Sequence, residues 1–107
     1  MDQTGTFPCG IKNDQGEICR DFVLKERTFR HTLELANDQT INKDLLNDPA
    51  YYDAAVISKR VTVAGIAKLT PEMVLDLEGE DGDALANAIM DLDKRRGEFR
   101  KAQLPAT

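Results

Sequence analysis

The chain has 107 residues, enough for one domain with a sizeable core but not for a second one. Hydrophobic residues make up 41% and charged residues 31%, a balance that is ordinary for a globular protein and too apolar for a wholly disordered one. The net charge of −5 argues against general attraction to nucleic-acid backbones or anionic membranes. It favours solubility, or a partner with basic patches. We expect a single domain over residues 1–107, with an ordered core at about residues 5–99 and a flexible tail at 102–107.

No apolar run approaches the roughly 20 residues needed to cross a bilayer. The first five residues lack the basic start and the apolar stretch of a signal peptide. These two features predict a protein of the cytoplasm. Two cysteines are too few for a disulfide scaffold in any case.

The first quarter of the chain predicts a β-hairpin. Residues 4–11 and 17–24 both alternate apolar and polar side chains with a period of two, although Arg20 interrupts the second run. Between them, residues 13–16 read Asn-Asp-Gln-Gly, which suits a tight turn because Asx side chains bond the backbone and Gly tolerates positive φ.

A turn centred on Asp14 and Gln15 fixes the pairing of the two strands. The expected pairs are Lys12 with Glu17, Ile11 with Ile18, and Phe7 with Phe22. In this register Cys9 and Cys19 point to opposite faces of the hairpin. We therefore expect two reduced thiols.

From residue 26 to residue 36 the pattern becomes helical. Phe29, Leu33 and Ala36 fall at i, i+4 and i+7, which predicts an inward stripe, with Thr28 as a cap. Residues 37–48 are polar and rich in Asn and Asp, which predicts a loop with one short turn around Leu45 and Leu46.

Two further helices are expected to begin at Pro residues that follow capping side chains. Asp48-Pro49 starts the first, and Thr70-Pro71 starts a shorter one that ends at Gly79. Between them, residues 61–63 read Val-Thr-Val and predict an extended segment, with Gly65 as a breaker.

Asp81-Gly82-Asp83 is expected to open the last helix, with Leu85, Ile89 and Leu92 on one face. Gly97 either ends this helix, or the helix continues and Phe99 extends the same stripe. The whole predicts an α+β fold, an N-terminal β-hairpin followed by three or four helices.

The sequence offers no recognisable catalytic constellation. His31 is the only histidine and has no readable nucleophile or orienting carboxylate, so we expect an ordinary surface or half-buried side chain. Cys9, Cys19 and His31 lack the C-x-x-C spacing of a zinc site, and nothing identifies a base for a catalytic thiolate. The acidic run at residues 78–83 fails the calcium-loop pattern at its sixth and twelfth positions, which favours a polar turn with a helix cap. We predict no enzyme, no cofactor and no metal.

A basic cluster near the C-terminus leaves two interpretations open. Residues 94–96 read Lys-Arg-Arg, and Arg100 and Lys101 follow, with acidic residues between them. A solvated helix end is the favoured interpretation. A small regulator that binds nucleic acid through this cluster is the other, although Phe99 is the only aromatic residue available for stacking.

Taken in order, several segments resemble the tail-assembly chaperones of long-tailed bacteriophages and prophages, particularly those of contractile-tailed, Mu-like phages. The segments are Gly16-Glu17-Ile18-Cys19-Arg20-Asp21-Phe22-Val23-Leu24-Lys25-Glu26, Val61-Thr62-Val63-Ala64-Gly65-Ile66, Leu69-Thr70-Pro71-Glu72, and Leu77 with Asp81-Gly82-Asp83-Ala84-Leu85. The resemblance spans roughly residues 11–99 and rests on turn signals and apolar spacing. Arg27-Thr28-Phe29 stands where the family often has Leu-Thr-Gly.

This resemblance implies a non-catalytic protein that binds the helical, apolar tape-measure protein and keeps it soluble while tail-tube subunits polymerise. The implied partners are the tape-measure protein and the tail-tube protein, in the cytoplasm of a bacterial host, with self-association as a further option. The alternative is a structural neck or tail-completion component that stays in the particle. Neither implies a small-molecule substrate, a membrane or nucleic acid. Side-chain type alone suggests six partner-binding residues: Tyr51, Tyr52, Met73, Leu77, Ile89 and Met90.

Overall fold

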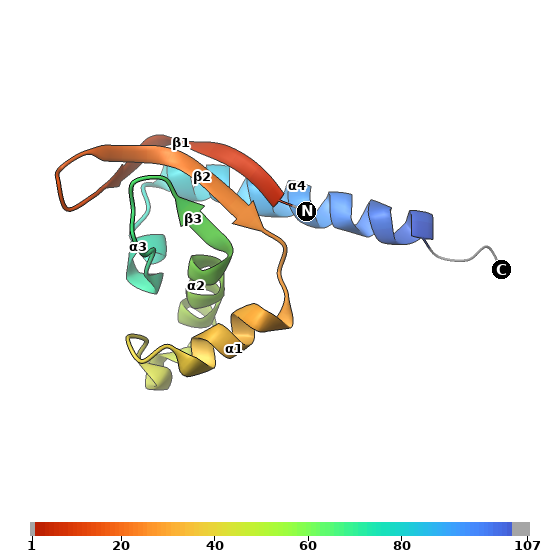
Figure 1. Cartoon of the computed structure of the whole chain (residues 1–107), viewed down its shortest axis with the longest axis horizontal. Helices are drawn as coiled ribbons and strands as arrows, with labels where there is room; N and C mark the ends of the chain where they lie inside the picture. Colours follow the sequence, from red (N-terminus) through yellow and green to blue (C-terminus); the bar gives the residue numbers. More distant parts are fainter. Residues whose placement is uncertain (1, 104–107) are drawn as a thin grey trace.

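The computed structural model describes residues 2–103 and confirms the α+β class. Strands β1 (Asp2–Lys12) and β2 (Ile18–Lys25) form the predicted hairpin, and β3 (Val61–Val63) joins it in the order β1-β2-β3 (Figure 1). The helices are α1 (Phe29–Asn37), the 3-10 helix η1 (Lys43–Asn47), α2 (Pro49–Arg60), α3 (Pro71–Leu75) and α4 (Gly79–Gln103). Of the tail predicted to be flexible, residues 102 and 103 belong to α4, and residues 104–107 lie outside the described residues.

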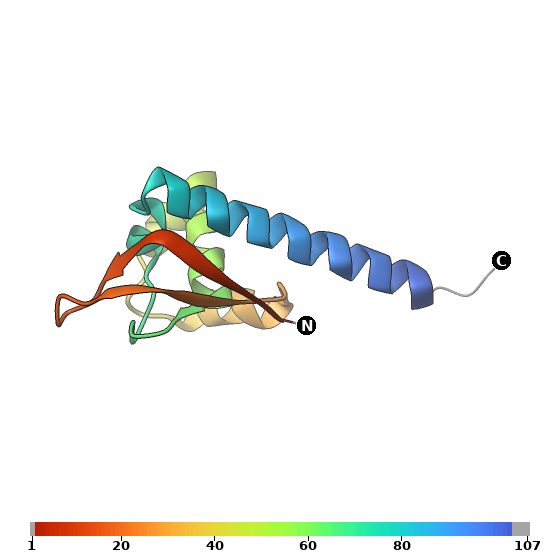
Figure 2. The ribbon, with the colours of Figure 1, turned by 90° about the horizontal axis from the view of Figure 1, so that it is seen from above.

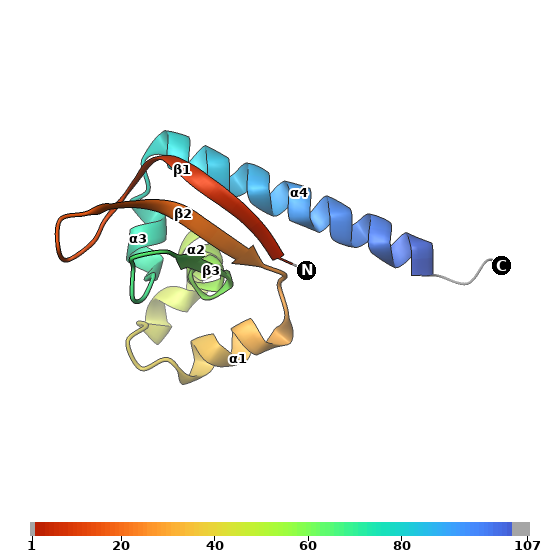
Figure 3. The ribbon, with the colours of Figure 1, turned by 45° about the horizontal axis from the view of Figure 1, so that its top comes forward.

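The molecule is elongated because α4 extends beyond the rest of the fold. It packs along β1 and then continues well past the end of the sheet (Figures 1 and 2). The molecule measures 55 × 32 × 21 Å along its principal axes. Helix α2 leads directly into β3, and α1 packs on α2 away from the sheet (Figure 3). Within residues 2–103, no helix combines the length and the apolar composition that a bilayer span requires.

The hairpin turn forms where it was predicted, but the predicted register is wrong. Asn13 closes the turn, because its Oδ1 accepts from the backbone N–H groups of Gln15 at 3.0 Å and Glu17 at 2.9 Å. Next to the turn, Ile11 pairs with Cys19, one residue away from the expected partner. Further from the turn, Gly5 pairs with Phe22, so the register shifts between Thr6 and Ile11.

A bulge in β1 accounts for this shift. Pro8 has no N–H to give to the ladder, and Gly10 has a φ of +95°, a conformation that suits Gly. Although Phe7 and Phe22 are not paired across the ladder, their ring centroids lie 4.6 Å apart. The structure has both thiols free, with Cys9 exposed and Cys19 buried.

Two groups of buried side chains hold the fold together. The larger lies between the sheet and α4 and consists of Phe7, Cys19, Phe22, Leu24, Val61, Val63, Leu69, Leu85, Ala88 and Leu92. The smaller lies where α1, η1 and α2 meet and consists of Leu35, Ile41, Tyr51, Ala55 and Val56. Since α1 contributes to the smaller group only through Leu35, this helix covers α2 rather than the main core.

The capping signals place the helix starts of α2 and α3 correctly. Asp48 accepts from the Ala50 N–H at 3.0 Å, and Thr70 accepts from the Met73 N–H at 3.2 Å. Gly79 was predicted to end α3, but it is the first residue of α4.

The last helix does not end at Gly97 but continues through it, which was one of the two alternatives left open by the sequence. Leu85 and Leu92 are buried as predicted, and Ile89 is partly buried. Phe99 lies seven residues after Leu92 and therefore on nearly the same face, but it is 52% exposed. Arg95, one turn before Phe99, contacts Gln3 near the start of β1, and α4 continues beyond the end of the sheet (Figure 2).

Candidate partner-binding surface

Helix α1 presents to solvent the stripe that was predicted to face the core. Phe29 is 72% exposed, Leu33 is 48% exposed, and Ala36 is also exposed. The buried residues of this helix are His31 and Leu35. The predicted orientation is therefore wrong, and the correction leaves a row of apolar side chains at i, i+4 and i+7 on the outside of the protein.

The start of α1 is fixed by a histidine. His31 was expected at or near the surface, but it is only 6% exposed. Its Nδ1 accepts a hydrogen bond from the Thr28 backbone N–H at 3.0 Å, which satisfies a donor at the helix N-terminus. Burial lowers the pKa of His31, so the neutral ring is the form that caps the helix.

The end of α1 is fixed by a carboxylate. Asp38 follows the helix and forms ion pairs with Lys59 of α2 and, at 3.1 Å, with Lys68. It also accepts from the Thr40 backbone N–H at 2.9 Å. Lys59 first, then Thr40, holds the pKa of Asp38 well below its usual range, against the opposing effect of burial. His31 caps the first turn of α1 and Asp38 ties its C-terminal end to α2, so the outward stripe lies on an ordered helix.

This stripe has the character of a partner surface. Covering a Phe or Leu side chain contributes about 1.5–3 kcal/mol, and Phe29 and Leu33 leave much of that unrealised in the free protein. Their spacing of four residues matches one side of a helix–helix contact. A second apolar helix could pack against them without any change in the fold.

The projecting end of α4 adds a second apolar position. Leu85, Leu92 and Phe99 recur every seven residues, and the first two are covered by the sheet. Phe99 continues the same face into solvent. The periodicity identified this stripe correctly, but it held no information on where the sheet would stop.

The six residues suggested from side-chain type do not form one exposed surface. Tyr51 is buried at 5% exposure, and its hydroxyl donates to Glu72 Oε1 of α3 at 3.3 Å. Burial, together with Glu72, raises the pKa of Tyr51. Tyr52 is partly buried against the same small core group, so neither tyrosine is a fully exposed anchor.

The other four suggested residues divide in the same way. Met73, Leu77 and Ile89 are partly buried against the larger core group. Met90 is 67% exposed on α4 and is the most open of the six. A binding role for these residues stays a prediction, whereas the α1 stripe is the surface that the sequence analysis missed.

The cysteines and acidic residues that were considered for metal binding or catalysis have structural roles or unreactive surroundings. Among residues 2–103, no three His, Cys, Asp or Glu side chains are grouped so that they could hold a metal ion. The pKa of the Cys9 thiol is raised by partial desolvation and by the carboxylates of Asp81 and Glu80, which favours the thiol over the thiolate. Asp81 is fully buried and accepts from the backbone N–H groups of Cys9 at 2.8 Å and Gly10 at 2.9 Å. The acidic segment therefore fastens α4 to the bulge of β1.

Fold and surface together define a small α+β domain with an outward apolar face on α1. Its last helix projects well beyond the rest of the fold (Figures 1 and 3). In comparisons with known proteins, no protein-family model, no curated protein and no solved structure matches the chain.

Proposed function

We propose that this protein is a non-catalytic phage tail-assembly chaperone that binds an amphipathic helical segment of the tape-measure protein during tail morphogenesis. The observation that carries the proposal is the exposed stripe of Phe29, Leu33 and Ala36 on α1. A helix-binding chaperone needs apolar surface that stays open until the client arrives.

The way α1 is held supports this role. His31 and Asp38 fix the two ends of the helix, so little conformational entropy is lost when a client helix packs on it. The net charge of −5 also suits a chaperone, because it opposes self-aggregation through the open apolar stripe.

The test is co-expression with the tape-measure protein encoded in the same genome, followed by measurement of the soluble tape-measure fraction and a pull-down. The double variant Phe29→Ser/Leu33→Ser removes the stripe. Leu75→Ser is the matched control, because Leu75 of α3 is 52% exposed and Leu33 is 48% exposed.

We expect the wild-type protein and Leu75→Ser to keep the tape-measure protein in solution. The double variant should keep its own thermal midpoint, since both residues are exposed, and should lose the client. Equal protection by the double variant would show that α1 is not the docking surface. Recovery of this protein from purified virions at fixed stoichiometry would favour a structural component of the particle instead.

A further inference from the structure

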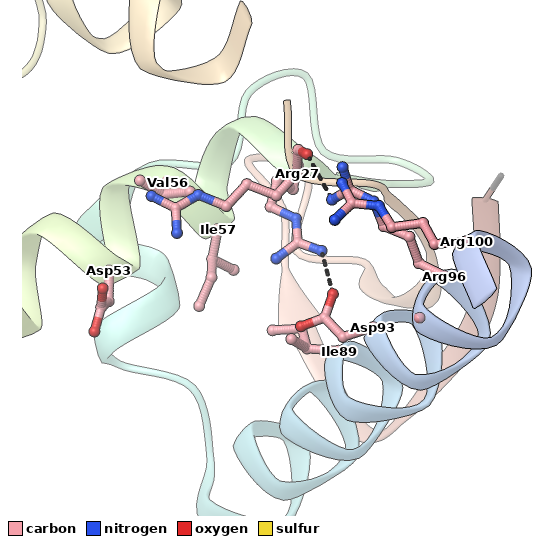
Figure 4. Close-up of a pocket in the computed structure, with 10 residues that line it drawn as sticks. Arg27, Asp53, Val56, Ile57, Ile89, Asp93, Arg96 and Arg100 are labelled. Carbon is pink, nitrogen blue, oxygen red and sulfur yellow. Dashed lines mark hydrogen bonds and ion pairs between the residues drawn. The ribbon is translucent and has the colours of Figure 1, made fainter. Parts of the chain in front are cut away.

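A cavity of about 500 Å³ lies between the C-terminal part of α2, the linker from β2 to α1, and the middle of α4 (Figure 4). Its charged lining residues are Arg27, Asp53, Arg60, Asp93, Arg96 and Arg100. The four arginines outnumber the two aspartates, although the chain as a whole carries a net charge of −5. Positive charge is thus concentrated at one place in an acidic protein.

Arg60 is the key member of this set. The residue is only 5% exposed, and its Nε donates to the Lys25 backbone carbonyl at 3.0 Å. Its Nη2 is buried and makes no hydrogen bond, and Asp93 Oδ1 approaches it only to 3.8 Å, the contact drawn from Asp93 in Figure 4. A buried guanidinium nitrogen without a hydrogen bond is costly, and an oxygen ligand that takes the place of Asp93 beside Nη2 would remove that cost.

The neighbouring arginines add further positive charge around Arg60. Burial lowers the pKa of Arg60; Asp93 opposes this effect, and the positive charges of Arg27 and Arg96 reinforce it. Arg96 is held in place, because its Nη1 donates to the Arg27 backbone carbonyl at 3.1 Å. Arg100 lies one turn further along α4 and lines the same cavity (Figure 4).

We propose that this cavity is an oxyanion-binding site for a ligand that bears a phosphate or carboxylate group, with Arg60 at its base and Arg96 and Arg100 at its rim. Arginine side chains present paired N–H donors in a fork that matches both of these groups. The site does not depend on the proposed function, since its features are the buried arginine and the charge around the cavity.

Two residues prepare the site for a ligand. The Asp93 side chain is 58% exposed, so it can turn away from Arg60 when a stronger anion arrives. Gly97 also lines the cavity, and a Cβ at this position would meet nothing within 4 Å. The absence of a side chain at Gly97 keeps this wall of the cavity open.

The test is a titration of the full chain with sodium phosphate in one arm and sodium glutarate in the other, with sodium chloride holding the ionic strength constant. The signals to follow are the Arg60 Nε–H and the backbone amide of Gly97 in ¹H–¹⁵N NMR spectra. Saturation by phosphate alone identifies a phosphate ligand, and saturation by glutarate identifies a carboxylate ligand. Either result supports the site.

Three variants separate a built site from general attraction of anions. Arg100→Gln should weaken binding by about threefold or more, whereas Lys101→Gln, the same change of charge on an exposed neighbour outside the cavity, should change it by less than about twofold. Gly97→Leu should place an apolar side chain in the cavity and weaken binding without any change of charge. Asp93→Asn should tighten binding by about threefold, because it removes the competing carboxylate.

The proposal fails if neither anion saturates the signals in the millimolar range. It also fails if Gly97→Leu leaves binding unchanged, or if Arg100→Gln and Lys101→Gln weaken binding equally. These last two outcomes would mean that anions associate with the basic end of α4 rather than with the cavity.

Discussion

Asp81 joins the first turn of α4 to the bulge of β1, so its replacement tests directly how α4 is held against the sheet. The side chain is fully buried, and its two oxygens accept from two consecutive backbone amides of β1, those of Cys9 and Gly10. The distances of 2.8 and 2.9 Å are those of strong, charge-assisted hydrogen bonds.

The expected loss of stability follows from these two bonds. A hydrogen bond to a charged group contributes about 1.5–3 kcal/mol, so the loss of two such bonds in Asp81→Ala should cost about 3–6 kcal/mol in the free energy of unfolding. Asp81→Asn keeps one acceptor oxygen but sets its NH₂ group against the second amide, and should cost about half as much. Since small domains are stable by only about 5–15 kcal/mol, both effects should be large on this scale.

The assay is equilibrium unfolding in urea followed by circular dichroism, with amide hydrogen exchange as a local measurement. Asp83→Asn is the matched control, because Asp83 lies two residues further along the same helix start and is exposed. In Asp81→Asn, the amides of Cys9 and Gly10 should lose more protection than the rest of β1. A change within about 0.5 kcal/mol of the Asp83→Asn control would refute the argument that Asp81 fastens the bulge.

Two further predictions concern α1 and the hairpin. Because the pKa of His31 is lowered in the folded state, the unfolded chain takes up the proton first as the pH falls. The wild-type protein should therefore lose stability below about pH 6.5, and His31→Gln, which retains a capping acceptor, should lack this loss when urea midpoints are compared across pH. Gly5→Ala would place a Cβ 2.3 Å from Phe22 Cζ and should lower the free energy of unfolding by about 1–3 kcal/mol. In the control Gly79→Ala, the new Cβ meets nothing within 4 Å, so this variant should not lose stability. Equal thermal midpoints for the two variants would contradict the close packing of Gly5 on Phe22.

Local signals in the sequence were sufficient for much of the fold. Asp48-Pro49 and Thr70-Pro71 mark the starts of α2 and α3, because a capping side chain followed by Pro acts within one turn of helix. The extended segment Val61–Val63 was likewise predicted from its own residues. Each of these features is decided by neighbouring residues, and the structure confirms all of them.

The bulge of β1 has a signal in the sequence. Pro8 and Gly10 interrupt an alternating strand, and both residues are typical of bulges and irregular edges. Alternation alone predicts a regular hairpin, and the observed pairing next to the turn differs from it by one residue. The position of Asp81 against the bulge had no such signal, because more than 70 residues separate it from Gly10 along the chain.

The orientation of α1 shows what periodicity alone leaves undecided. The helix has an apolar row at Phe29 and Leu33 and a second apolar position at Leu35. The periodicity predicts that the row of Phe29 and Leu33 faces the core, but Leu35 packs with α2 and η1 while that row faces solvent. The pattern identifies apolar faces, and tertiary packing decides which face is covered.

The cavity arginines could not be found from sequence because they come from separate segments. Arg96 and Arg100 belong to a basic cluster whose favoured interpretation was a solvated helix end, and Arg27 and Arg60 gave no signal of their own. Spacing by four residues places Arg96 and Arg100 on one face of a helix, but only the fold supplies Arg60 opposite them.

The two proposed sites meet at the start of α1, and this proximity constrains the client. Arg27 lines the cavity and lies two residues before Phe29, the first residue of the exposed stripe. A net charge of −5 would by itself favour a basic client at long range. A helix that packs on Phe29 and extends toward Arg27 gains if it carries an acidic side chain at that end. Under the proposed function, we therefore expect a client helix that is apolar along one face and carries an acidic side chain at the end nearest Arg27.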